Sequence, residues 1–136
     1  ETVALESAVS RVSAQRHLAA AGIDAPRLET LAELCEAGDP ALRAWLDRAV
    51  EPLSAAITIV ENLFDPEAVI LGGAMPGTVL DHLIGAVALP ARSVANRPDR
   101  PPPRLIRGTS GRLTATLGAA ALVINLACTP KIAVAH

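Results

Sequence analysis

The spacing of apolar residues along the chain predicts a helix-rich protein. Apolar side chains recur every three or four residues, which places them on one face of a helix. The predicted helices cover residues 1–21, 28–37, 40–63, 76–90 and 113–128, and a separate helical turn reaches Asn96. The residues expected to face inward are Leu5, Ala8, Val9, Val12 and Ala19 in the first helix, and Leu42, Trp45, Leu46, Ala49, Leu53, Ala56, Val60 and Leu63 in the third.

Glycine and proline residues predict where these helices begin, end or bend. Gly22 and Gly38 are expected to end the first two helices. Asp39 followed by Pro40 predicts a helix start, because aspartate caps free backbone N–H groups and proline suits the first helical position. Pro52 lies inside the third pattern, and we expect it to kink or divide that helix because it lacks an N–H donor.

A short apolar run at residues 68–71, bounded by proline and glycine, predicts a strand buried on both faces. Residues 105–106 predict a second strand. With the helix between them, these strands form a βαβ unit. The two strands run parallel, and the connection between them is right-handed. The last helix is the most apolar, and Gly118 is expected to let it pack closely against a sheet.

Two parallel strands cannot bury both faces of an apolar strand or pair both of its edges. The chain also begins inside a helical pattern and without a methionine. We therefore expect residues 1–136 to be the C-terminal part of a larger domain, whose N-terminal part supplies further strands. The expected fold class is α/β, with two parallel strands in a βαβ unit.

The composition fits one packed domain and limits the class of ligand. The chain has 136 residues, of which 51% are hydrophobic, but it contains one Phe, one Trp and no Tyr, so few aromatic rings can stack on sugars or bases. Nothing resembles a signal peptide or a membrane span. Cys35 and Cys128 stand far apart, without metal-ligand spacing or a framework of bridges, so no metal site is predicted and a reducing, cytoplasmic setting is expected.

The charges are unevenly distributed along the chain. Through Asp81 there are 13 acidic residues against 5 arginines, whereas Asp99 is the one acidic residue after it. The later arginines are Arg92, Arg97, Arg100, Arg104, Arg107 and Arg112. They could form a basic rim suited to phosphate or to an acidic face of the same fold, or they could simply be solvated.

Two stretches of the chain carry a family resemblance. Residues 62–73 read NLFDPEAVILGG, and residues 112–122 read RLTATLGAAAL. Together with the helical pattern before them, they resemble the C-terminal region of the ROK family of repressors, open reading frames and kinases. The resemblance covers nearly the whole chain and implies an actin-like, ribonuclease H-like ATPase fold that binds sugars and, in the kinases, nucleotides.

The resemblance also implies site residues. Glu1 is similar to a glutamate that contacts sugar hydroxyls in the family, although an acidic residue at this place would also suit a helix dipole. Gly72 and Gly73 match glycines that approach the nucleotide, although a tight turn after a strand also requires glycine. No catalytic residue is assigned, because the family's catalytic aspartate and zinc-binding cysteines would precede Glu1. Asp65 is interpreted as a turn residue, and Asp81 as a solvated one.

Two functions follow from the resemblance. The first is a sugar-responsive transcriptional regulator, in which this chain is part of the sugar-sensing body and DNA is bound by a separate domain. It is favoured by Arg112, which departs from the kinase pattern. The alternative is an ATP-dependent sugar kinase, glucokinase-like or specific for N-acetylated amino sugars, with ATP and Mg as cofactors. A homo-oligomer, either a dimer or a tetramer, is expected in both cases.

Overall fold

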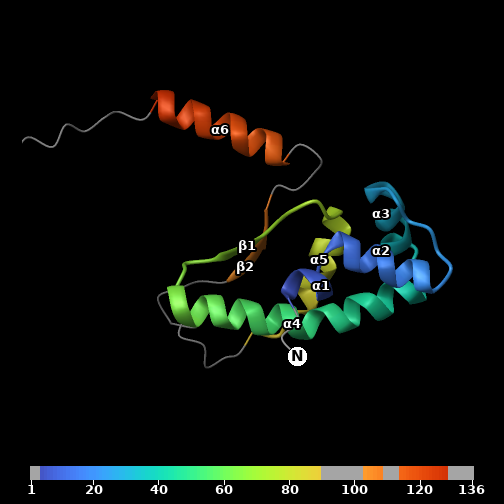
Figure 1. Ribbon diagram of the computed structural model, residues 1–136. Helices are drawn as coiled ribbons and strands as arrows, with labels where there is room; N and C mark the ends of the chain where they lie inside the picture. Colours follow the sequence, from blue (N-terminus) through green and yellow to red (C-terminus); the bar gives the residue numbers. More distant parts are fainter. Residues whose placement is uncertain (1–3, 90–102, 109–113, 129–136) are drawn as a thin grey trace, which may run out of the picture.

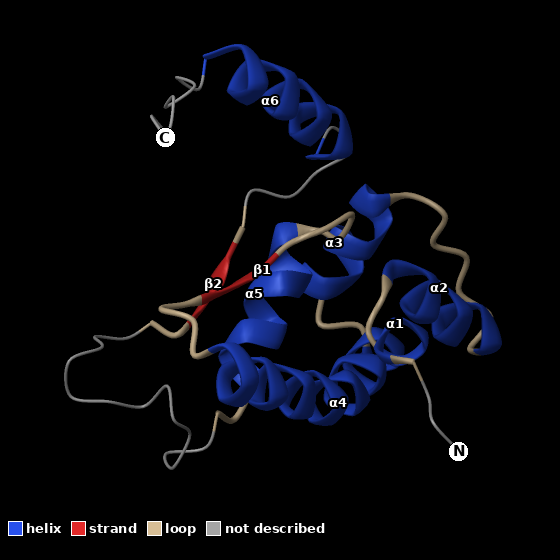
Figure 2. Ribbon diagram, turned by 60° about the vertical axis from the view of Figure 1, so that its left-hand side comes forward, coloured by secondary structure: helices blue, strands red, loops and turns tan. Residues whose placement is uncertain are grey.

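A computed structural model describes residues 4–89, 103–108 and 114–128 as a helix-rich α/β arrangement (Figure 1). The long helix α4 lies along one side, and α5 lies between it and a pair of short strands (Figure 2). None of the described helices has the length and apolar character needed to cross a membrane. The elements are α1 (Leu5–Ala8), α2 (Arg11–Ala20), α3 (Leu28–Glu36), α4 (Pro40–Phe64), β1 (Val69–Leu71), α5 (Gly77–Ala86), β2 (Leu105–Arg107) and α6 (Thr114–Cys128).

The N-terminal segment forms two short helices, where the apolar pattern predicts one. Ser10 interrupts the helix because its hydroxyl accepts a hydrogen bond from the Ser13 N–H at 3.1 Å and so starts α2 anew. The break rotates the buried face. Ser13, Ala14 and Leu18 are buried in α2. The predicted inward face is therefore wrong at Val12, which is 53% exposed, and also at Leu5 and Ala19.

The predicted connection between α3 and α4 is confirmed. Gly38 adopts a φ of 68°, in the left-handed region where glycine lacks the steric cost of a side chain. The Asp39 carboxylate then accepts hydrogen bonds from the N–H groups of Ala41 and Leu42, both at 2.9 Å. Pro40 occupies the first position of α4, as its fixed φ and missing N–H favour.

Helix α4 continues through Pro52 from Pro40 to Phe64, so the proline does not divide it. The predicted buried face holds as far as Leu53 but is wrong beyond it. Ile57 and Glu61 are buried there, whereas Leu63 is 71% exposed and Val60 is also exposed. Beyond Leu53 the buried residues follow at intervals of four, and Glu61 among them pairs with Arg104 from the segment that leads into β2.

The predicted pair of parallel strands is confirmed. Val69 pairs with Leu105, Ile70 with Ile106 and Leu71 with Arg107. Val69 and Leu71 pack against the core, because alternate residues of a strand point to the same face. The prediction of burial on both faces is wrong within the described residues, since Ile70 on the other face is 66% exposed.

Helix α5 connects the two strands through the core. Val79, Leu80 and Leu83 are buried, as their helical spacing predicts, and α5 packs against α3, α4 and β2. It ends at Ala86, before Pro90. The predicted helical turn up to Asn96 lies outside the described residues.

Helix α6 confirms the helix predicted from the apolar C-terminal run, but its packing differs from the prediction. No described atom lies within 4 Å of the place that a Cβ would take on Gly118. Leu122, Val123 and Ile124 are 61–67% exposed. Figures 1 and 2 both show α6 apart from the other elements. The expected close contact between Gly118 and a sheet is therefore absent from the described part of the chain.

Of the arginines predicted to form a basic rim, Arg104 and Arg107 lie in the described residues, and both pair with carboxylates of the same fold. Arg104 donates through Nε and Nη2 to the two carboxylate oxygens of Glu61, each at 2.9 Å. This pair is buried, with 14% of the arginine side chain and 1% of the glutamate side chain exposed. Arg107 lies 3.2 Å from Asp81 in an exposed pair. Arg92, Arg97, Arg100 and Arg112 lie outside the described residues.

The substitution Arg104→Met is expected to lower the free energy of unfolding by about 3–5 kcal/mol, because it leaves the buried Glu61 carboxylate without its guanidinium partner. The matched control, Arg107→Met, breaks an exposed pair and should cost less than about 1 kcal/mol. Urea unfolding followed by circular dichroism measures both values. Equal losses in the two variants would contradict the structural role of the Glu61–Arg104 pair.

Candidate glycine cleft at the strand ends

A cavity of about 470 Å³ lies between the α1–α2 junction and the turn that follows β1. Ligands of α/β sheets bind beyond the carboxyl ends of the strands, and this cavity occupies that position at the end of β1. We call it the glycine cleft. Its lining consists of Glu6, Val9, Ser10, Arg11, Val12, Leu71, Gly72, Gly73, Ala74, Met75, Leu80 and Leu83.

Gly72 and Gly73 form the β1 side of the glycine cleft, and their approach to a nucleotide stays a prediction. Gly73 has a φ of 131°, a conformation that L-amino acids with side chains rarely adopt. Gly72 has no such φ, and a Cβ built on it meets no described atom within 4 Å. The two glycines therefore differ. The backbone conformation at residue 73 requires glycine, whereas at Gly72 a side chain would enter open space.

Gly108 lies at the same edge of the sheet and was not predicted as a site residue. Its N–H donates to the Leu71 carbonyl oxygen at 2.8 Å, directly after β2. A Cβ on Gly108 would lie 2.8 Å from Cγ2 of Ile70 and 3.8 Å from Cα of Gly72. The signal was present in the sequence, because glycine directly after each of two parallel strands indicates close backbone approach at one edge.

The walls of the glycine cleft combine an apolar floor with a polar rim. Met75, Leu80 and Leu83 are buried and come from the segment after β1 and from α5. On the opposite side, Glu6 and Arg11 are exposed and bring one negative and one positive charge to the mouth. Such a lining suits a small molecule with an apolar face and a few polar groups.

The other residues considered in the sequence do not join the glycine cleft. Glu1 lies outside the described residues. Asp65 ends α4 with a left-handed φ of 46°, which confirms it as a turn residue. Asp81 is exposed and paired with Arg107. His17 lines a different cavity beside Arg48. Within the described ranges, no three His, Cys, Asp or Glu residues are arranged to hold a metal ion.

Cys35 is a free, half-buried thiol near the α3–α4 connection. Burial raises its pKa above the usual value of 9.0, because removing the thiolate from water disfavours the charged form. The Thr78 side chain and the Arg43 guanidinium lower the pKa and the Glu36 carboxylate raises it, but burial has the largest effect. A thiolate nucleophile is therefore not favoured at this position.

Comparison with known proteins identifies a family. A model of the ROK family matches residues 1–126 of the 136-residue chain. Neither the curated proteins nor the solved structures give a match.

The variants Gly73→Ala and Gly72→Ala are expected to separate backbone strain from open space. Gly73→Ala should lower the free energy of unfolding by about 1–3 kcal/mol, since alanine must adopt an unfavourable φ. Gly72→Ala should change it by less than about 0.5 kcal/mol, because its Cβ has room. Chemical denaturation checks both values, and a large loss for Gly72→Ala would show that the turn is packed more tightly than described.

Cys35 is expected to react with iodoacetamide more slowly at pH 8 than a cysteine in an unfolded peptide, because its raised pKa lowers the fraction of thiolate. The variant Cys128→Ser leaves Cys35 as the one cysteine that can be labelled, and mass spectrometry measures its modification. Labelling as fast as in urea would refute the burial of the thiol.

The raised pKa also makes stability depend on pH. Its contribution to the folded state is fully present below pH 9.0, the unfolded pKa, and is lost as the pH rises through the higher folded pKa.

Proposed function

Because the chain belongs to the ROK family, we propose that it is part of the sugar-sensing body of a sugar-responsive transcriptional regulator. The proposed fold is that of an actin-like ATPase domain. The observation that supports this proposal most directly is the glycine cleft, an open cavity built from two segments far apart in the sequence. A ligand in this cavity would contact both the α1–α2 junction and the β1–α5 turn.

This architecture supports a sensing mechanism based on population shift. A ligand that contacts both segments favours the conformation in which they are correctly spaced, and it shifts the population only by its difference in affinity between conformations. Helix α1 is the element of this junction that is least held by burial, because none of its residues is buried, whereas α2 buries Ser13, Ala14 and Leu18. In a regulator, the shift would change the relative placement of DNA-binding domains in a homo-oligomer.

The described lining of the cleft supplies groups that can bind a ligand. Among its described lining residues, Glu6 is the single carboxylate, and it is exposed at the mouth rather than held against a buried floor. A general base must lie within hydrogen-bonding distance of the proton it removes and must be oriented there. In the described lining, the cleft offers apolar surface and backbone N–H and C=O groups instead.

An ATP-dependent sugar kinase of the same family is the second candidate, and the glycines of the cleft favour it. Gly72 and Gly73 leave room for a nucleotide to approach the main chain, and Met75, Leu80 and Leu83 offer an apolar surface to a base. The lining therefore fits a nucleotide. Bound ATP with Mg would supply the phosphoryl group, whereas these residues would bind and orient it. Glu1 remains the proposed sugar-contacting residue.

Sugar binding and catalysis are distinguished by one pair of measurements on the protein. We expect a hexose or an N-acetylated amino sugar to bind in calorimetry and to change affinity for operator DNA, without ATP consumption in a coupled assay. Substantial turnover with ATP and Mg would replace the regulator with the kinase. Absence of binding by every sugar tested, with or without ATP, would reject both candidates.

The variant Gly72→Ala tests the position of the ligand. Its Cβ would occupy space that a ligand needs, so the affinity for the ligand that binds the glycine cleft should fall about tenfold or more. The matched control is Gly85→Ala, which also places a Cβ in open space but lies on α5 outside the cleft lining. Equal affinities in the two variants would show that the ligand does not approach Gly72.

A further inference from the structure

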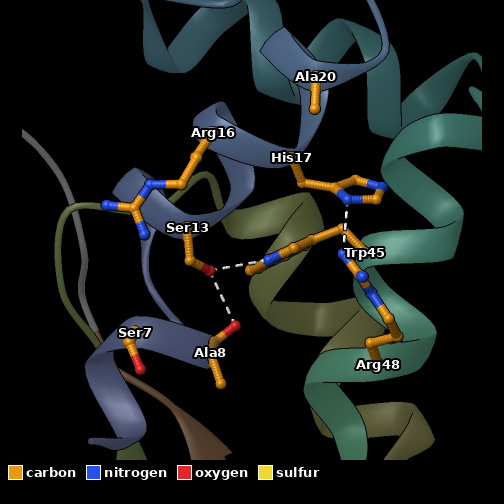
Figure 3. A pocket seen from close by; sticks show the side chains of 8 residues that line it. All are labelled: Ser7, Ala8, Ser13, Arg16, His17, Ala20, Trp45 and Arg48. Atoms are coloured by element: carbon orange, nitrogen blue, oxygen red, sulfur yellow. Dashed lines mark hydrogen bonds between the residues drawn. The ribbon is translucent and has the colours of Figure 1, made fainter. Parts of the chain in front are cut away.

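A second cavity, of about 380 Å³, lies between α1, α2 and α4, on a different face of the α1–α2 junction from the glycine cleft (Figure 3). We call it the arginine cavity. Three basic side chains line it: Arg16 and His17 from α2, and Arg48 from α4. No carboxylate lines it among the described residues, although the half of the chain that contains it is rich in acidic residues.

The floor of the arginine cavity is held by a chain of hydrogen bonds. The indole Nε1 of Trp45 donates to Oγ of Ser13 at 2.8 Å, and this hydroxyl donates to the Ala8 carbonyl oxygen at 2.8 Å. Trp45 and Ser13 are buried. All three helices are therefore tied together beneath the cavity, which gives the basic side chains a fixed base.

Arg48 is held by a hydrogen bond to His17 and not by a carboxylate. Its Nη2 donates to Nδ1 of His17 across 2.5 Å. A guanidinium can only donate, so Nδ1 of His17 is the acceptor in this contact. Neither Arg48 nor Arg16 forms an ion pair within the described part of the chain. Two exposed guanidinium groups without an ion-pair partner therefore line one cavity.

The two arginines approach the cavity from different helices. In Figure 3, Arg16 lies on one side, Arg48 with His17 lies on the other, and Trp45 lies between them. A guanidinium matches the planar geometry of phosphate and carboxylate groups and can bind them through two parallel hydrogen bonds. An anion that compensates both charges must be long enough to reach both sides.

We propose that the arginine cavity is a second ligand site, which binds a small organic anion carrying two acidic groups. One phosphate or carboxylate group pairs with Arg48, the other pairs with Arg16, and the body of the ligand lies over Trp45. The volume suits a small metabolite. The arginine cavity shares no lining residue with the glycine cleft, although a hollow of about 240 Å³ is lined by residues of both, among them Glu6 and Arg16.

Calorimetry with pyrophosphate and with succinate tests this proposal on the protein. We expect saturable binding of at least one of these dianions, and weaker binding of inorganic phosphate and acetate at equal ionic strength. Preference for pyrophosphate identifies phosphate as the recognised group, and preference for succinate identifies carboxylate. If neither dianion shows saturable binding at millimolar concentration, the proposal is wrong.

Variants locate the bound anion. Arg48→Gln and Arg16→Gln should each weaken binding by roughly ten- to a hundredfold, as expected for loss of a charge-assisted hydrogen bond. Arg43→Gln is the matched control, because Arg43 is an exposed arginine of α4 that does not line this cavity, and its affinity should stay within about twofold. An equal loss in Arg43→Gln would indicate nonspecific charge attraction and would overturn the proposal.

A final variant separates this site from the glycine cleft. Gly72→Ala should leave dianion binding unchanged, because Gly72 does not line the arginine cavity. If Gly72→Ala abolishes pyrophosphate binding while Arg48→Gln retains it, the anion binds in the glycine cleft and the arginine cavity is not a site. Circular dichroism confirms that each variant is folded.

Discussion

The buried ion pair between Glu61 and Arg104 is the constraint on which the arrangement of the sheet depends. Each strand has three residues, and two such strands form a marginal sheet by themselves. The pair ties the end of α4 to the residue that precedes β2, with two hydrogen bonds of 2.9 Å. Arg104 also accepts the Val69 N–H at its carbonyl oxygen, so the same residue begins the strand pairing. The side-chain contact of Arg104 with Glu61 and its main-chain contact with Val69 therefore favour the same pairing of β1 with β2.

That register brings glycines together at the carboxyl ends of both strands. With Leu71 opposite Arg107, the next residues along the two strands are Gly72 and Gly108, whose backbones come close. A Cβ on Gly108 would lie 2.8 Å from Cγ2 of Ile70, so a larger residue at this position would require the Ile70 side chain to shift. Gly72 also lines the glycine cleft, to which Leu80 and Leu83 of α5 give an apolar floor.

The break between α1 and α2 places residues in the linings of both cavities. Ser10 caps α2 and lines the glycine cleft, while Ser13, three residues on, receives the Trp45 hydrogen bond beneath the arginine cavity. A single continuous helix would have turned these side chains in other directions. The capping box therefore positions residues that line both cavities.

The sequence by itself determined the order of the elements, the Asp39–Pro40 helix start, the parallel strands and the two glycines after β1, because caps, glycines and apolar runs act over a few neighbouring residues. The tertiary structure decided what depends on distant partners. It turned Glu61 inward toward Arg104, left Ile70 exposed, brought Gly108 beside Gly72 and placed Arg16 across from Arg48. Local patterns carry no information about such pairs, since the groups that stabilise them lie tens of residues apart in the chain.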